Sequence, residues 1–107
     1  MTTILVVDDH VNKRKTVIAA LIKRYEVAET DHPKLASLLI EKLQPSVILI
    51  NQLSLSFDAL RFFLNIKDQY PKTPVLLYAL KCPDAIRILK QTLSMALGKK
   101  KLTFNLG

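Results

Sequence analysis

The residues in this chain that could do chemistry are two acids and an amide, and each follows a short apolar run. Asp8 and Asp9 come directly after an N-terminal run, and Asn51 ends the most hydrophobic run of the chain. Without a cation or a lysine beside them, two adjacent carboxylates repel each other and the pKa of one rises. These residues include no nucleophile paired with a base and no metal cluster, so we expect that the protein is not an enzyme.

Apolar runs of strand length alternate with stretches in which apolar side chains recur at helical spacing. The runs that predict strands are residues 3–7, 25–28, 46–50, 74–78 and 102–106. Four helices are predicted between them, the last of which opens at Pro83 and stops at Gly98. Such an alternation predicts a mostly parallel sheet with helices on both faces, joined by right-handed crossovers.

In a sheet of this kind, the carboxyl ends of the strands form the crevice in which functional residues gather. Asp8 and Asp9 follow the first predicted strand, Asn51 follows the third, and Ala79 follows the fourth. We therefore expect these four residues to lie together at one end of the sheet.

Residues 4–10, Ile-Leu-Val-Val-Asp-Asp-His, resemble the opening of a receiver domain of a bacterial two-component response regulator. The resemblance covers nearly the whole chain, and Asp58 stands where such domains often carry an acid before the third helix. It implies one receiver-like domain over residues 1–107 with a flavodoxin-like (CheY-like) α/β fold. The implied sheet is a doubly wound, parallel, five-stranded one with strand order 2-1-3-4-5.

In the family that these residues resemble, two N-terminal acids and an aspartate after strand three hold Mg²⁺, and that aspartate accepts a phosphoryl group. A Ser or Thr after strand four and a Lys after strand five bind the phosphoryl oxygens. By the resemblance, Asp8 and Asp9 are the two acids, and Asn51 occupies the acceptor position. Ala79 occupies the hydroxyl position.

This chain departs from the family pattern at these phosphoryl-binding positions. The amide of Asn51 is neutral and is not a useful nucleophile, and it is a poorer ligand for Mg²⁺ than a carboxylate. Ala79 cannot donate a hydrogen bond. The strand pattern places Asn105 at the lysine position, whereas spacing from Ala79 places Lys101 there. We interpret the chain as an atypical, phosphorylation-independent receiver without a cofactor, in which Asp8 and Asp9 could retain some binding of Mg²⁺.

The predicted C-terminal end of the fold also differs from the family. A receiver domain normally continues after strand five with a helix that covers one face of the sheet, and here only Gly107 follows. Loss of that helix would expose apolar surface, which usually marks an interface. Either a partner or a second copy covers this face, or the chain is a fragment of a longer product. We expect a protein partner or a homodimer through the face of strand four, helix four and strand five. The expected contact residues are Tyr78, Ile86, Leu89, Leu93, Leu102 and Phe104.

Two other functions stay open at this point. The first is a phosphorylatable receiver that uses another acid, such as Asp9 or Asp58. The second is a nucleic-acid-associated module, because the net charge is +7 and residues 99–101 are all lysines. Three lysines in a turn are more often only solvated, so we do not expect nucleic acid as the partner.

The sequence also favours a cytoplasmic protein that does not enter a membrane. No apolar run reaches the length of a membrane span, and the N-terminus lacks the pattern of a secretory signal. Cys82 is the single cysteine, so no disulfide can form within the chain.

Overall fold

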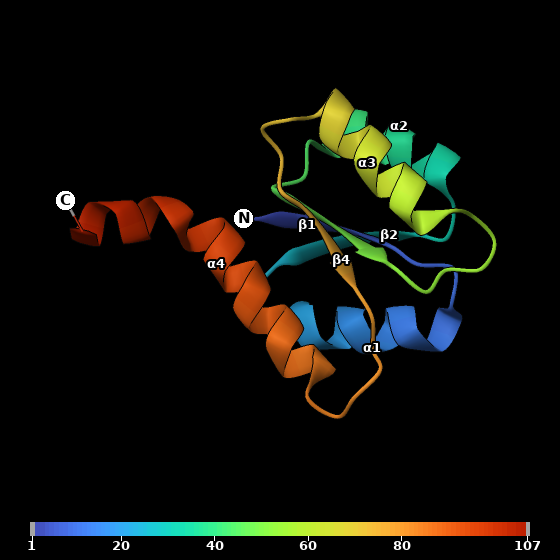
Figure 1. The fold of residues 1–107 in the computed structure, drawn as a ribbon, viewed down its shortest axis with the longest axis horizontal. Helices are drawn as coiled ribbons and strands as arrows, with labels where there is room; N and C mark the ends of the chain where they lie inside the picture. Colours follow the sequence, from blue (N-terminus) through green and yellow to red (C-terminus); the bar gives the residue numbers. More distant parts are fainter. Residues whose placement is uncertain (1, 107) are drawn as a thin grey trace.

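The computed structural model describes residues 2–106, with the side chains of residues 2–98. Strands and helices alternate along the chain, and the four strands form one parallel sheet in the order β2-β1-β3-β4 (Figure 1). The strands are β1 Thr3–Val7, β2 Glu26–Thr30, β3 Val47–Asn51 and β4 Val75–Tyr78. The helices are α1 Val11–Leu21, α2 Pro33–Leu43, α3 Ala59–Gln69 and α4 Ala85–Leu106. The predicted doubly wound α/β class and the order of the first four strands are confirmed.

The two central strands are the most apolar segments of the chain because helices cover both of their faces. All five residues of β3 are buried, and so are the last four residues of β1. Strands buried on both faces read as continuous runs of branched apolar residues, and this is what β1 and β3 show. The carboxyl ends of these two strands therefore lie at the centre of the sheet.

Helices lie on both faces of the sheet (Figure 1), and an apolar layer fills the space on each face. On one face, Ala36 and Ile40 of α2 and Phe62 and Ile66 of α3 pack against the sheet. On the opposite face, α1 and α4 pack against the sheet through Val17, Leu21, Leu89 and Leu93. None of the described helices combines the length and the hydropathy that crossing a membrane requires.

The predicted fifth strand is wrong. The backbone of residues 102–106 is helical and belongs to α4, which continues without a break through Gly98. A glycine inside a helix costs about 1 kcal/mol relative to alanine but does not force the helix to end. A five-residue alternation is too short to outweigh the helical register that precedes it. The described sheet therefore has four strands, and β4 lies at its edge.

The face that we expected to be uncovered is covered by α4. This helix contacts α1 and lies beside it on the same side of the sheet. Tyr78, Leu89 and Leu93, three of the expected contact residues, are therefore buried inside the monomer. Ile86 is half-buried against the same apolar layer. The side chains of the other two expected contact residues, Leu102 and Phe104, lie outside the described side chains.

Candidate functional site

Three side chains from neighbouring strands meet at the carboxyl end of the sheet. Asp8 follows β1, Asn51 ends β3, and Tyr78 ends β4 directly opposite Asn51. All three are buried. Alternate residues of a strand point to the same face, and all three side chains lie on the face that α1 and α4 cover, like Val6 and Leu49 before them.

The carboxylate of Asp8 accepts three hydrogen bonds from the protein itself. Its Oδ1 accepts from the backbone N–H of His10 at 2.7 Å and from Nδ2 of Asn51 at 2.9 Å. Its Oδ2 accepts from the hydroxyl of Tyr78 at 2.5 Å. A buried carboxylate is costly unless donors compensate for the lost water, and these three donors provide that compensation.

The hydroxyl of Tyr78 is a permanent donor in this network. Burial raises the pKa of Tyr78 well above its ordinary value, and the hydrogen bond to the negative carboxylate of Asp8 raises it further. The hydroxyl is therefore protonated at neutral pH and donates to Asp8. We had expected Tyr78 at an interface. The strand alternation that it shares with Asp8 and Asn51 is the signal that would have placed it here.

Asn51 is fixed at both ends of its amide. Its Nδ2 donates to Asp8, and its Oδ1 accepts from the backbone N–H of Leu53 at 2.9 Å. A carboxylate has no donor to offer to Asp8 and would meet it as a like charge. The contacts around this position are therefore matched to an amide rather than to an aspartate.

Asp9 points away from this network and holds the loop that follows β3. Its Oδ2 accepts from the backbone N–H groups of Leu55 at 2.8 Å and Ser56 at 2.6 Å. Partial burial alone would raise the pKa of Asp9. Hydrogen bonds from Ser56 and from the amide of Leu55 outweigh that effect and leave the pKa below its ordinary value. The second acid of the pair is thus ionised and serves to anchor the loop.

Arg14, on the first turn of α1, connects this site to the edge of the sheet. Its Nη1 donates to the backbone oxygen of Asp8 at 2.6 Å, and its Nε forms an ion pair with Glu29 of β2 at 2.8 Å. No pattern in the sequence singles out Arg14. Only the folded chain brings it close to Asp8 and Glu29.

The residues at this site fit a divalent cation poorly. Among the described residues, no group of three or more His, Cys, Asp or Glu side chains could hold a metal ion. A cation beside Asp8 would have to displace the donors of His10, Asn51 or Tyr78. It would gain only Asp9 as a second carboxylate, and that group already accepts from two amides.

Among the other predicted positions whose side chains are described, none adds a phosphate-binding group. Ala79 has no side-chain donor, and its backbone oxygen accepts from the N–H of Lys81 at 3.0 Å. Neither Asn105 nor Lys101 lies on a strand, because both belong to α4, and their side chains lie outside those described. Asp58 is exposed and is the N-cap of α3, where its Oδ1 accepts from the N–H of Arg61 at 3.0 Å. This is a common structural role for an aspartate at a helix start.

The comparisons with known proteins match the chain through its fold rather than its sequence. No protein-family model matches the sequence, and no curated protein resembles it in sequence. The structure of NtrX from Brucella abortus in complex with ADP superposes with a TM-score of 0.79 at 23% identity. That match covers 99% of this chain but only 28% of the NtrX chain.

Two shorter proteins match over nearly their whole length. The signal receiver domain of a putative LuxO repressor from Vibrio parahaemolyticus has a TM-score of 0.76 at 14% identity, covering 98% of this chain and 96% of that one. The chemotaxis response regulator CheY4 of Vibrio cholerae has a TM-score of 0.75 at 22% identity, covering 90% and 98%. The chain therefore has the flavodoxin-like fold of the receiver domains of response regulators.

Proposed function

We propose that this protein is an atypical receiver domain that takes part in signal transduction by binding a protein partner, without being phosphorylated. The observation that carries the proposal is the position of Asn51 at the end of β3, with its amide hydrogen-bonded to Asp8 and to the N–H of Leu53. An amide is not a useful nucleophile toward phosphorus. The state of the two neighbouring acids supports the proposal, since Asp8 is completely buried and Asp9 accepts two backbone hydrogen bonds from the loop after β3.

The hydrogen bonds of the site also favour a rigid module over a switch. In a phosphorylatable site the acceptor must be reachable by the donor, whereas Asn51 and Asp8 are completely buried. Tyr78 lies over the same carboxylate and closes the network from the side of β4. This connected set of hydrogen bonds supports a module that does not rearrange.

The test is the intact mass of the protein after incubation with Mg²⁺ and acetyl phosphate. The wild-type chain is expected to remain unmodified. An Asn51→Asp variant, treated in the same way, restores a carboxylate at the acceptor position and tests whether its absence is the limiting defect. A gain of one phosphoryl group by the wild type, mapped to Asp9 or Asp58, would overturn the proposal and make this protein a switch with a relocated acceptor.

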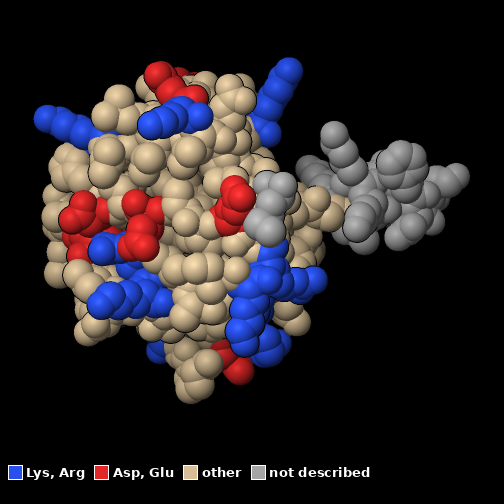
Figure 2. Space-filling model, turned by 180° about the vertical axis from the view of Figure 1, so that it is seen from behind, with Lys and Arg blue, Asp and Glu red and all other residues tan. Residues whose placement is uncertain are grey.

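A second function, binding to nucleic acid, has one observation in its favour. Figure 2 shows Lys and Arg side chains gathered at the lower right of the molecule, on the side of the α1 and α4 layer. Arg24 and Lys90 line a shallow pocket between these two helices. Contact with phosphates would give binding that falls steeply with salt. Salt-dependent binding to duplex DNA or RNA that is lost on neutralising Lys99, Lys100 and Lys101 would favour this alternative.

A further inference from the structure

Strand β4 is an edge strand of the described sheet. In the described part of the chain no strand pairs with this edge. Toward β3, the oxygens of Pro74 and Tyr78 accept from Ile48 and Gln52. Because successive residues of a strand direct their backbone groups to opposite sides, Val75 and Leu77 present their N–H and C=O groups to the open edge.

The two edges of the sheet differ in how they are protected. Natural proteins protect edge strands with charged residues, which discourage pairing with another chain. The edge strand β2 follows this rule, since Glu26 and Glu29 are exposed on it. Strand β4 reads Val-Leu-Leu-Tyr and carries no charge. Its edge therefore remains open to pairing with a further strand.

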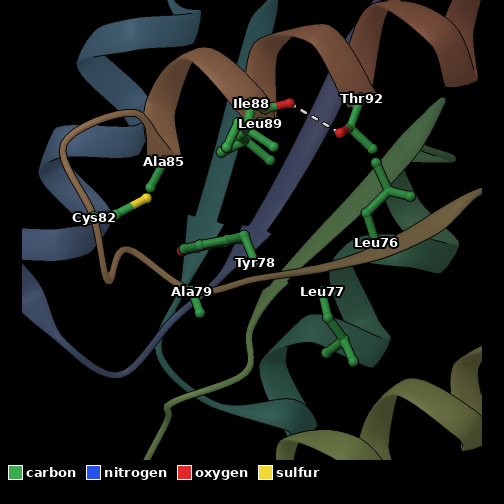
Figure 3. Close-up of a pocket in the computed structure, with 9 residues that line it drawn as sticks. All are labelled: Leu76, Leu77, Tyr78, Ala79, Cys82, Ala85, Ile88, Leu89 and Thr92. Carbon is green, nitrogen blue, oxygen red and sulfur yellow. Dashed lines mark hydrogen bonds between the residues drawn. The ribbon is translucent and has the colours of Figure 1, made fainter.

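Apolar side chains flank this open edge on both faces of the sheet. Leu76 and Leu77 point to opposite sides of β4 (Figure 3), where each is partly buried against a different apolar layer. On the side of α4, a groove of about 170 Å³ runs between β4 and the start of the helix. Ile88 lines this groove and is 49% exposed. An added strand could extend both apolar layers with its alternate side chains.

The charges beside β4 indicate what kind of strand would fit. Lys72 and Lys81 are the only charged residues between positions 69 and 83, and both are exposed. They stand before and after β4, whereas the nearest following acid, Asp84, lies 3.5 Å from Arg87. In an antiparallel pair of two β4 strands, Lys72 of each copy would approach Lys81 of the other, and like charges in this position are destabilising. Acidic residues at both ends of the added strand would be attracted instead.

We propose that the open edge of β4 binds an extended segment of another protein, apolar at alternate positions and acidic at both ends, by adding it to the sheet as a fifth strand. In this mode of recognition, main-chain hydrogen bonds supply affinity, and pockets for alternate side chains supply specificity. The proposal rests on the proposed function in that it identifies the chemistry of the protein partner. It makes no use of the buried Asp8 network.

The test uses a fluorescein-labelled synthetic peptide in which alternating Val and Thr residues are flanked by two Glu residues at each end. Fluorescence anisotropy measures its binding to the full chain. Two control peptides have the same length, one with Lys in place of Glu and one with Pro at the central Val. Only the Glu-flanked peptide is expected to bind, and its binding should weaken with salt. Hydrogen exchange of the Val75 and Leu77 amides should slow in the complex.

Variants of the protein locate the binding edge. Leu77→Pro removes an outward-facing N–H and no hydrogen bond to β3, which is the position in an edge strand where proline is tolerated. Ile88→Asn makes the groove polar. Each is expected to weaken binding roughly tenfold or more. The matched control is Leu38→Asn, on the outer face of α2, where Leu38 is 65% exposed. This control should bind like the wild type.

A charge-reversal variant keeps the test decisive if Leu77→Pro fails to fold. Lys72→Glu combined with Lys81→Glu leaves the exposed backbone unchanged and should shift the preference from the Glu-flanked to the Lys-flanked peptide. The proposal is overturned if the Glu-flanked peptide does not bind, or if Leu77→Pro, in folded form, and Ile88→Asn leave its binding unchanged. It is also overturned if sedimentation shows a dimer in which the Val75 and Leu77 amides are protected, because a second copy then occupies the edge. None of these outcomes affects the phosphorylation test, so the two proposals fail separately.

Discussion

Nδ2 of Asn51 donates a hydrogen bond to Oδ1 of Asp8 over 2.9 Å, so a neutral amide from the neighbouring strand compensates this buried acid. In a working phosphoacceptor site both residues would be carboxylates that share a cation. Here the neutral amide of Asn51 stands beside Asp8, so the pair has no second negative charge for a cation to balance. On the proposed function, an amide at this position supplies no nucleophile, and the same amide stabilises the buried acid.

Asn51→Asp should destabilise the fold. The change removes a donor from buried Asp8 and places two carboxylates in contact, which raises the pKa of one of them. Leaving a buried polar group without its partner costs about 1–3 kcal/mol, and the cost is larger for a charged group. Urea denaturation at neutral pH should show this loss in the free energy of unfolding. Mg²⁺ should recover more of the stability of the variant than of the wild type, because a cation can bridge the two acids.

The matched control for this substitution is Asn65→Asp. Asn65 lies on α3 and is exposed, so the same chemical change there should have little effect on stability. If Asn51→Asp unfolds at the same urea concentration as the wild type, the hydrogen bond to Asp8 contributes nothing to stability and our description of the site is wrong.

Tyr78→Phe should also lower stability, through the other oxygen of the same carboxylate. The ring keeps its packing, and only the hydroxyl that donates to Oδ2 of Asp8 is removed. We expect a loss of about 1–3 kcal/mol in the free energy of unfolding. Tyr70→Phe is the control, since Tyr70 is only partly buried. Equal effects of the two changes would mean that the hydrogen bond to Asp8 is not a special feature of Tyr78.

The residues of this network show which parts of the site could be predicted from the sequence. Asp8, Asp9 and Asn51 could be placed at one end of the sheet, because each follows an apolar run and parallel strands end at the same edge. The role of Tyr78 depended on the register of three strands, and Arg14 depended on how α1 lies against β2. These relationships join residues that are far apart in the chain, and no local pattern encodes them.

The fold could be predicted as far as β4 and no further. The first four strands are defined by branched apolar runs, and their order follows from the crossovers. After β4 the chain offers two conflicting signals, a helical spacing up to Leu97 and an alternating pattern in residues 102–106. We gave weight to Gly98 as a helix stop. In the structure the helix passes through this glycine, so α4 takes the place of both the fifth strand and the missing covering helix.

The stability of the protein should fall in acid because of Asp9. The pKa of this carboxyl is lower in the folded chain than its ordinary value of 3.8. The contribution of Asp9 to stability is therefore complete above pH about 4 and is lost as the pH falls through the lower, folded-state pKa. Urea denaturation at a series of pH values below 5 should show this fall. Asp9→Asn should make the same curve flatter.

The control for the acid dependence is Asp31→Asn, a change at an exposed aspartate outside the site. Its curve should keep the slope of the wild type. Identical slopes for the wild type and Asp9→Asn would show that the amides of Leu55 and Ser56 do not favour the ionised form of Asp9.

Gly98→Ala tests whether α4 continues through residue 98. A β-carbon added at Gly98 meets no atom within 4 Å, and the position lies inside α4. Alanine is favoured over glycine in a helix by about 1 kcal/mol, so the variant should gain helical signal in circular dichroism and melt at a higher temperature. If a turn and a fifth strand followed this residue, as we predicted from the sequence, the alanine would disrupt the turn and lower the melting temperature. A lower melting temperature for Gly98→Ala would therefore support the five-stranded sheet. A fifth strand of the chain itself would then pair with β4, and the edge on which binding of an added strand depends would be occupied.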